Sequence, residues 1–197
     1  MIATLLLAAG ASRRMRGGDK LLEEIDGEPL LRLMARRCLA ARLGPVLVPL
    51  PALDHPRAAV LQGLDARPLA VPEAAEGMGA SIRTAVAALD MPLRGVLILP
   101  ADMPEITTED LQSLASAFQG TPLPILRGAS GETPGHPVLF PAALMPELEK
   151  LNGDRGASPV IAAHKDLLRL VPLPGAHATT DLDAPEAWSE WRRSRGR

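Results

Sequence analysis

Apolar runs of strand length alternate with segments of helical spacing along the whole chain. Residues 2–7 and 95–99 are the clearest wholly apolar runs, and they end near a glycine and a proline, as buried strands do. Weaker runs predict further strands at residues 45–50, 67–71, 124–127, 137–140 and 167–173. The chain is therefore expected to build a sheet from short, buried strands.

Helical patterns lie between these strands. Pro29 precedes a run of apolar residues with helical spacing. Thr107 and Thr108 are candidate N-caps for a helix around residues 111–118, and Asp110 completes a capping box with Thr107. Further helices are predicted at residues 56–64, after the glycines of GMGASIRTAVAALD, at residues 142–151 and from Pro185 onward. This alternation predicts an α/β three-layer fold with a mostly parallel central sheet and helices on both faces.

The composition is that of one compact globular domain, residues 1–197, with 47% hydrophobic residues. Aromatic side chains are scarce, with two Trp, two Phe and no Tyr, so the core must be mainly aliphatic. The net charge of −2 gives no polycationic field and disfavours a nucleic-acid partner. We expect the basic tail WRRSRGR to be a solvated end.

The N-terminal stretch LLLAAGASRRMRGGDKLL has two incompatible interpretations, an export signal or a strand that leads into a phosphate-binding loop. A signal peptide carries positive charge before its apolar run, whereas Arg13 and Arg14 follow the run here. The run is also shorter than the roughly 20 apolar residues that cross a bilayer. We therefore favour the phosphate-binding loop and expect no membrane association.

The single cysteine, Cys38, excludes an intrachain disulfide. It lies on the apolar face of a predicted helix, where a buried structural thiol is favoured over a nucleophile. This cysteine usage fits a reducing cytoplasm, where we expect the protein to be located.

The loop after the first strand combines small residues with positive charge. In sheets of this kind, ligands bind at the carboxyl ends of the strands. The small residues of AAGASRRMRGGDK let backbone N–H groups approach an anion, and Arg13, Arg14 and Lys20 suit a polyphosphate. The loop contains neither GxxxxGK[ST] nor GxGxxG, so a Walker loop and a dinucleotide site are disfavoured. A surface turn with solvated charges is the alternative.

Candidate metal ligands follow a second strand. Asp102, in PADMP, comes directly after the apolar run 95–99, where a Mg²⁺ ligand would serve a bound polyphosphate. A turn or capping role is the alternative. Asp181 or Asp183 could complete the metal site, while Asp183 is also well placed to cap the helix that Pro185 opens.

Two further features could contact a substrate. Gly77 and Gly79 precede Ser81 at a predicted helix start, which offers backbone donors and a hydroxyl to a base or ribose. A plain glycine-rich helix start has the same pattern. His136, in GHP, lies beside a predicted strand and suits a structural role and a substrate contact equally well.

Taken together, these segments resemble the MobA-like nucleotidyltransferases, which are cytidylyl- and guanylyltransferases of the molybdenum cofactor. LLLAAGASRRMRGGDKLL is similar to the family signature LAAGxSxRM…K. EGMGASI, LPADMP, GHPVLF and DLDAPEAW resemble the family's later motifs, in the family's order. The resemblance runs nearly end to end and implies a Rossmann-like NTP-transferase fold.

The resemblance also implies roles for individual residues. In this family Lys20 and Arg14 would be catalytic triphosphate ligands, and Asp102 and Asp183 would hold Mg²⁺ as the cofactor. Nucleotide-binding positions would be Leu7, Ala8, Ala9, Gly10, Ser12, Gly79 and Ser81, with the first four acting through their backbone.

The details AAG, GMGAS and PADMP look most like the cytidylyltransferase branch. That branch would transfer CMP from CTP to molybdopterin and release pyrophosphate, and a molybdoenzyme or its chaperone would be a partner. The alternatives are a guanylyltransferase, a cytidylyltransferase for another phosphorylated acceptor, and a non-catalytic carrier of the molybdenum cofactor.

Two departures from the family pattern concern the loop and the acceptor. The loop reads RMRGGDK, where family members more often have Gly directly after Met. GDRGASP resembles the family's GDxGAR, but Ser158 replaces the final Arg. Either Arg155 contacts the acceptor in its place or the acceptor differs from that of the family, and His136 is a further candidate for contact with the acceptor.

Overall fold

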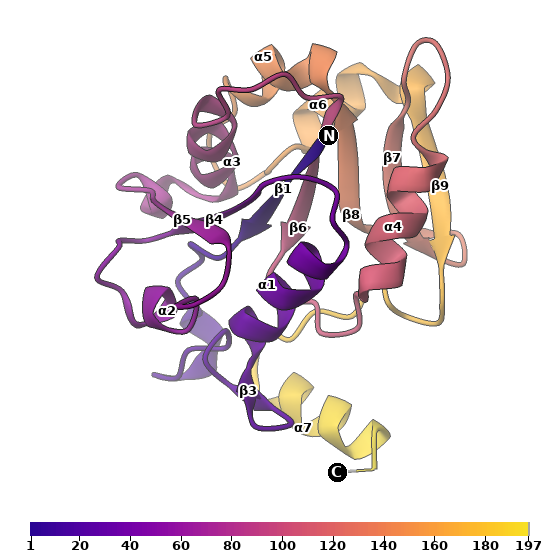
Figure 1. The fold of residues 1–197 in the computed structure, drawn as a ribbon. Coiled ribbons are helices and arrows are strands. Elements are labelled where there is room, and N and C mark those ends of the chain that lie inside the picture. Colours follow the sequence, from indigo (N-terminus) through magenta and orange to yellow (C-terminus); the bar gives the residue numbers. More distant parts are fainter. Residues whose placement is uncertain (197) are drawn as a thin grey trace.

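The computed structural model describes residues 1–196 and contains a seven-stranded sheet in the order β5-β4-β1-β6-β8-β7-β9 (Figure 1). Strand β8 is antiparallel to both of its neighbours, and the other strands all run in one direction. The strands are β1 (Ile2–Leu7), β4 (Val46–Leu50), β5 (Ala66–Ala70), β6 (Gly95–Pro100), β7 (Ile125–Ser130), β8 (Thr133–Pro141) and β9 (Leu168–Leu173). The predicted mostly parallel α/β sheet is confirmed.

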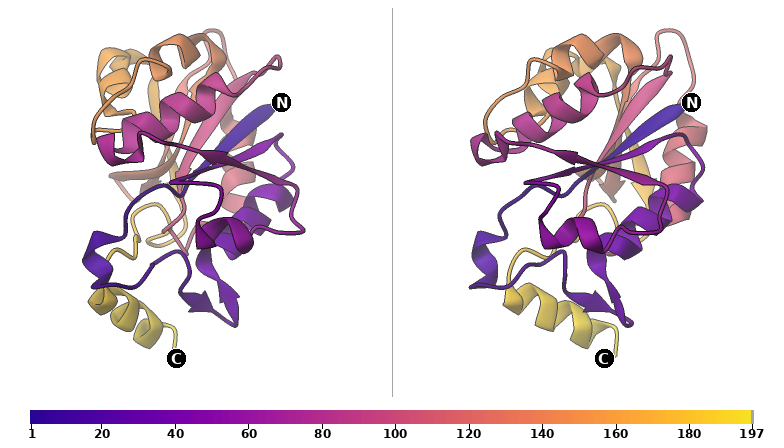
Figure 2. Two further views of the ribbon diagram at one scale, coloured as in Figure 1. Left: turned by 90° about the vertical axis from the view of Figure 1, so that its left-hand side faces the viewer. Right: turned by 60° about the vertical axis from the view of Figure 1, so that its left-hand side comes forward.

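Helices cover both faces of this sheet (Figures 1 and 2). Leu6 of β1 packs in the core on the side of α1 and α4, whereas Leu5 and Leu7 pack with α3, α5 and α6. Each central strand is thus buried on both faces, as its unbroken apolar run predicts. The α-helices are α1 (Leu30–Ala40), α2 (Pro56–Ala59), α3 (Met78–Ala87), α4 (Thr108–Ala117), α5 (Met145–Leu148), α6 (Ser158–Ala163) and α7 (Pro185–Ser194).

Shorter elements connect the main ones. Strands β2 (Glu24–Ile25) and β3 (Glu28–Pro29) form a small separate hairpin. Single turns of 3₁₀-helix lie at η1 (Arg13–Met15), η2 (Ala74–Glu76), η3 (Ala142–Leu144) and η4 (Lys165–Leu167). The sequence pattern predicts neither the hairpin nor α6, because each is too short to show a period.

Local sequence signals predict some helix ends correctly but overestimate the length of other helices. Thr107 caps α4, and its capping box with Asp110 is confirmed. The helix predicted at residues 56–64 ends at Ala59, because hydrogen bonds beyond it run to the third preceding residue rather than the fourth. The predicted helix 142–151 is divided into η3 and α5 for the same reason.

The C-terminal helix α7 is anchored to the rest of the fold, and the expectation of a solvated basic tail is confirmed only for residues 193–196, which are exposed. Trp188 is buried and meets Trp191 edge to face, with ring centroids 6.0 Å apart. Arg192 lies over the Trp188 ring and pairs with Glu23 next to the β2–β3 hairpin. Arg197, the last residue of the expected tail, lies outside the described residues.

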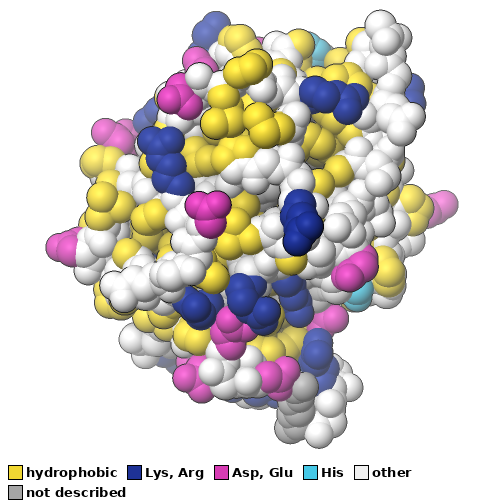
Figure 3. Space-filling model, in the orientation of Figure 1, with side chains coloured by type: hydrophobic (Ala, Val, Ile, Leu, Met, Phe, Trp, Pro, Cys, Tyr) yellow, Lys and Arg dark blue, Asp and Glu magenta, His cyan; other side chains and the backbone are white. Residues whose placement is uncertain are grey.

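Other features of the fold bear on earlier expectations. Cys38 is buried in α1, and burial raises the pKa of its thiol to about 12, which confirms an inert structural cysteine. No helix within residues 1–196 is long and apolar enough to cross a membrane. Figure 3 shows basic and acidic side chains interspersed over the face that α1 and α4 form.

Candidate active site

The sheet reverses its strand order beside β1, and a cavity of about 650 Å³ opens there. The chain leaves β1 for β4 on one side, whereas β6 lies on the other side. Leu7 at the end of β1 pairs with Pro100 at the end of β6, and the N–H of Ala101 donates to the carbonyl of Leu7 at 3.0 Å. The loops after these two strands therefore lie together at the switch point of the sheet, where α/β proteins bind ligands.

The loop after β1 presents unpaired backbone donors to this cavity. Ala9, Gly10 and Ala11 line the cavity, and their N–H groups have no acceptor within residues 1–196. Ala8 differs, because its N–H donates to Pro49 and its carbonyl accepts from Arg57. A run of free N–H groups at the end of a strand forms an anion-binding concavity.

Arg57 holds this loop in place, although no sequence motif marks it. Arg57, only 2% exposed, donates to the carbonyls of Ala8 and Gly10 and to the hydroxyl of Ser12. Its guanidinium also makes a two-pronged ion pair with Asp19, at 2.7 and 2.8 Å. The Ser12 hydroxyl is thus engaged inside the loop, and its predicted contact with a nucleotide stays a prediction.

An Arg57→Lys variant should be less stable and bind nucleotide more weakly. Lysine keeps the charge but cannot make the planar fork, so Asp19 and two buried carbonyls lose partners. We expect a loss of about 3 kcal/mol in the free energy of unfolding and a raised KM for the nucleotide. Thermal unfolding and initial rates check this, with exposed Arg67→Lys as the matched control. Wild-type stability and KM in Arg57→Lys would contradict this role.

The contribution of the Arg57–Asp19 ion pair to the stability of the fold depends on pH. Burial alone would raise the pKa of Asp19, but hydrogen bonds from Arg57 and its charge lower that pKa below its ordinary value of 3.8. The contribution of the pair to stability is therefore complete above pH 3.8 and is lost as the pH falls through the lowered pKa. The stability gap between wild type and Arg57→Lys should narrow in that acid range.

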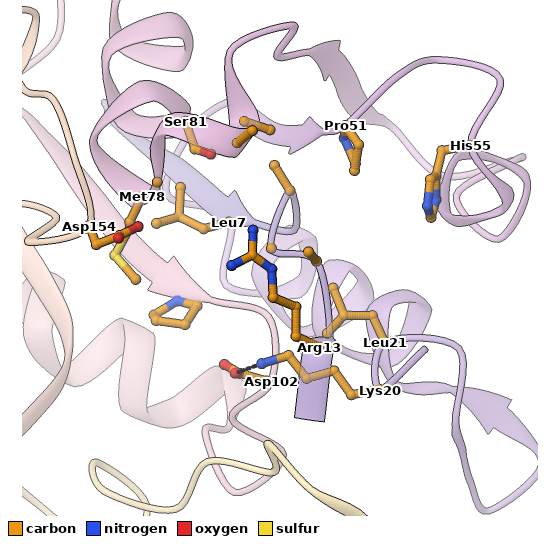
Figure 4. Close-up of a pocket in the computed structure, with 17 residues that line it drawn as sticks. Leu7, Arg13, Lys20, Leu21, Pro51, His55, Met78, Ser81, Asp102 and Asp154 are labelled. Atoms are coloured by element: carbon orange, nitrogen blue, oxygen red, sulfur yellow. Dashed lines mark hydrogen bonds and ion pairs between the residues drawn. The ribbon is translucent and has the colours of Figure 1, made fainter. Parts of the chain in front are cut away.

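Lys20 lies between two carboxylates at the mouth of the cavity. Its ammonium pairs with Asp102, as Figure 4 shows, and with Asp183 at 2.5 Å. Burial lowers the pKa of Lys20, but Asp102 and Asp183 together raise it above the usual value. Burial would likewise raise the pKa of Asp183, which Lys20 and Arg14 instead lower. The centre therefore places one ammonium between the two carboxyl groups of Asp102 and Asp183.

These carboxylates fit a divalent cation. The Oδ1 atom of Asp102 is buried and has no hydrogen-bond partner within residues 1–196. Burial and the charges of Asp183 and Asp102 raise the pKa of the nearby Asp181, which indicates excess negative charge. No group of three His, Cys, Asp or Glu side chains in the described chain forms a complete ligand set. Mg²⁺ commonly takes only one or two carboxylates and completes its shell with phosphate oxygens and water.

Asp183 does not cap α7, and its carboxylate lies beside Lys20 instead. The N-cap of α7 is Ala184, which makes no side-chain capping bond, so the predicted capping role of Asp183 is wrong. Its carboxylate instead accepts from Arg14 at 2.9 Å and pairs with Lys20. The side chain therefore faces the first loop rather than its own helix.

A second cavity, of about 430 Å³, adjoins the first. Both cavities are lined by Lys20 and Asp102, so they meet at the ammonium–carboxylate centre. His136 of β8 lines the second cavity. Burial, and then the charge of Arg127, lower the pKa of His136 to about 4, so its ring is neutral at pH 7.

The other predicted residues divide between the cavities and their surroundings. Ser81 lines the first cavity, whereas Gly79 packs against Asn152 and lines neither cavity. Arg13 lies over the first cavity (Figure 4), whereas Arg14 is 75% exposed and pairs with Asp183. Arg155 is exposed and lines neither cavity. The roles predicted for Gly79, Arg14 and Arg155 therefore stay predictions.

The fold and its two joined cavities define an α/β protein of the nucleotidyltransferase type. The sequence matches the MobA-like NTP transferase domain over residues 4–167, and the chain belongs to this family. The matched region ends before Asp181, Asp183 and α7.

Several known proteins are similar to this chain over nearly its whole length. The purine catabolism protein PucB of Bacillus subtilis is 29% identical over 204 aligned residues, which cover 96% of this chain and 95% of PucB. Among solved structures, Rv0371c of Mycobacterium tuberculosis is 22% identical with a TM-score of 0.82, covering 100% of this chain and 98% of that one. A nucleotidyl transferase from Methanothermobacter thermautotroptrophicus is 18% identical with a TM-score of 0.83, covering 100% and 99%. These two structures share the fold.

Proposed function

We propose that this protein transfers CMP from CTP to the phosphate of molybdopterin and releases pyrophosphate. The observation that carries the proposal is the meeting of two cavities at Lys20 and Asp102. A transfer between two substrates needs two sites whose reacting groups come together at one charged centre. The likeness of the AAG, GMGAS and PADMP segments to the cytidylyltransferase branch supports CTP and molybdopterin as those substrates.

In this proposal the nucleotide occupies the first cavity. The free N–H groups of Ala9, Gly10 and Ala11 bind phosphate oxygens, and Arg13 adds its charge over them. Ser81 faces the base or ribose from α3. Lys20 leaves the carboxylates partly and binds the oxygens of the α-phosphate.

The acceptor occupies the second cavity and attacks in line. A phosphate oxygen of the acceptor forms a bond to the α-phosphorus, and the bond from that phosphorus to the leaving pyrophosphate breaks. The acceptor phosphate is already ionised near neutral pH, so no side chain is needed as a nucleophile. The protein therefore acts by positioning the two phosphates and by stabilising charge through Lys20 and Arg13.

Asp102 and Asp183 are the residues that would hold Mg²⁺. The unpartnered oxygen of Asp102 supports this assignment. When bound, the ion supplies positive charge that neutralises the phosphates as they approach each other. A structure of Rv0371c has been determined with manganese, which is consistent with a divalent cation in this fold.

Wild-type protein should release pyrophosphate only with CTP, Mg²⁺ and molybdopterin present together. The experiment compares the four NTPs with and without molybdopterin and identifies the product by mass. CTP with Mg²⁺ should also raise the melting temperature by several degrees, because ligand binding stabilises the folded state.

Each other outcome contradicts part of the proposal. Release with GTP alone among the nucleotides would indicate a guanylyltransferase. Transfer to a sugar or polyol phosphate but not to molybdopterin would change the acceptor. Binding of molybdopterin without any effect of CTP and Mg²⁺ would indicate a carrier that hands the cofactor to a molybdoenzyme or its chaperone.

A further inference from the structure

The second cavity contains a guanidinium without a partner for its terminal amino groups. Arg127 of β7 is partly buried, and its Nε–H donates to the carbonyl of Gly135 at 2.9 Å. Its two amino groups reach no acceptor within residues 1–196, and no carboxylate there forms an ion pair with it. The Nε–H bond orients the guanidinium plane and leaves its outer edge available.

Arg127 differs from the other partly or fully buried arginines within residues 1–196. The other partly or fully buried arginines within residues 1–196 all use their amino groups on carbonyls or carboxylates, namely Arg32, Arg37, Arg57, Arg83 and Arg192. A desolvated cation without such partners is unfavourable unless a ligand supplies them.

A second unpartnered group lies beside it. The Nδ1 atom of His136 is buried and has no hydrogen-bond partner within residues 1–196. The backbone N–H of His136 donates to the carbonyl of Ala178 at 2.8 Å, which fixes the residue to the cavity wall. Both side chains line the cavity that ends at Lys20 and Asp102.

The wall that carries these side chains is closely packed. A Cβ at Gly135 would lie 1.8 Å from the carbonyl oxygen of Ala178, and one at Gly128 would lie 2.5 Å from that of His136. Only glycine allows these backbones to approach so closely. The backbone that carries the two side chains is therefore fixed by close contacts between main chains.

The sheet order sets the spacing between the two ends of the cavity. Asp102 follows β6, His136 belongs to β8 and Arg127 belongs to β7, and these strands are neighbours in that order. Two strand spacings correspond to about 10 Å. A ligand whose phosphate lies at Asp102 and Lys20 would thus reach Arg127 with its opposite end.

We infer that Arg127, with His136 beside it, binds the end of the acceptor that is remote from its attacking phosphate. The fork of a guanidinium matches the two adjacent hydrogen-bond acceptors of a carboxylate, and its N–H groups can also donate to the keto oxygen of a fused heterocycle. Arg127 thereby selects phosphorylated acceptors with such an end. The inference rests on the proposed function, because that function assigns the second cavity to the acceptor.

The test compares wild type with Arg127→Lys and Arg127→Gln in binding and transfer. The acceptors are molybdopterin, which has a keto oxygen on a fused heterocycle, 3-phosphoglycerate, which has a carboxylate, and glycerol 3-phosphate, which has neither. Both substitutions should raise KM for the preferred acceptor by about 30-fold while KM for CTP stays unchanged. Arg169→Gln, on the exposed neighbouring strand β9, is the matched control.

The outcomes separate the inference from the function on which it rests. The inference is supported if wild type prefers molybdopterin or 3-phosphoglycerate over glycerol 3-phosphate and both variants lose this preference. The preferred acceptor then shows which chemical group Arg127 binds. Transfer by wild type with an unchanged acceptor KM in folded Arg127 variants overturns the inference alone. Failure of wild type to bind any of the three acceptors overturns the proposed acceptor cavity, and the inference falls with it.

Discussion

An Asp102→Asn variant is expected to lose nucleotidyl transfer by at least about 100-fold, because one charge-stabilising contact in such a transition state contributes on the order of 3 kcal/mol. The amide keeps the size of the side chain but removes its charge, and its NH₂ group cannot accept from Lys20. It also cannot replace the buried Oδ1 atom as a cation ligand. Initial rates of pyrophosphate release and a Mn²⁺ titration measure the two effects.

The fold should survive this substitution. The side chain of Asp102 is 13% exposed, and its Oδ1 atom has no hydrogen-bond partner within residues 1–196. Replacing this carboxylate removes its ion pair with Lys20, but it also removes the cost of desolvating the carboxylate, and the two effects on stability offset each other. We expect a melting temperature close to that of wild type. Asp65→Asn, at an exposed position on the same molecule, is the matched control. If Asp102→Asn retained wild-type rates and Mn²⁺ affinity, the carboxylate would have no part in the site.

Lys20→Met should lose transfer by a similar factor of about 100 but keep its affinity for Mn²⁺. The ammonium separates Asp102 from Asp183, so its removal leaves the two carboxylates without their shared counter-charge. A divalent cation can supply that charge, and its affinity should therefore stay the same or rise. The opposite metal responses of Lys20→Met and Asp102→Asn distinguish a phosphate ligand from a metal ligand.

The comparison with an exposed lysine makes this test specific. Lys150→Met removes an ammonium group from the exposed surface and should leave the rate of transfer and the affinity for Mn²⁺ unchanged. A Lys20→Met variant that lost metal affinity together with activity would indicate that Lys20 only maintains the local structure. Full activity in that variant would remove Lys20 from the proposed mechanism.

The sequence predicts those parts of the fold whose signals are continuous and local. Strands β1 and β6 are recognisable because burial on both faces requires an unbroken apolar run. The capping box of α4 is recognisable because both partners lie three residues apart. The placement of the loops after β1 and β6 then follows from the general geometry of parallel sheets.

Long-range partnerships were not predictable from the sequence. Arg57 binds the carbonyls of Ala8 and Gly10, which every residue possesses, so no motif marks the contact. Arg127 is distinguished by the absence of a partner, which only the folded chain reveals. Asp183 had two local interpretations, and the choice between them depends on Lys20, which is 163 residues away in the chain.

The attachment of α7 to the loop after β1 affects when the candidate active site becomes complete during synthesis of the chain. Four ion pairs within residues 1–196 join the two regions: Arg14 with Asp183, Lys20 with Asp183, Arg16 with Glu186 and Glu23 with Arg192. The loop that carries Lys20 leaves the ribosome before Asp183, which lies 163 residues further along the chain. A nascent chain can therefore complete its sheet and still lack one of its two carboxylates. In the proposed mechanism, such a chain would be unable to consume nucleotide until the final helix had docked.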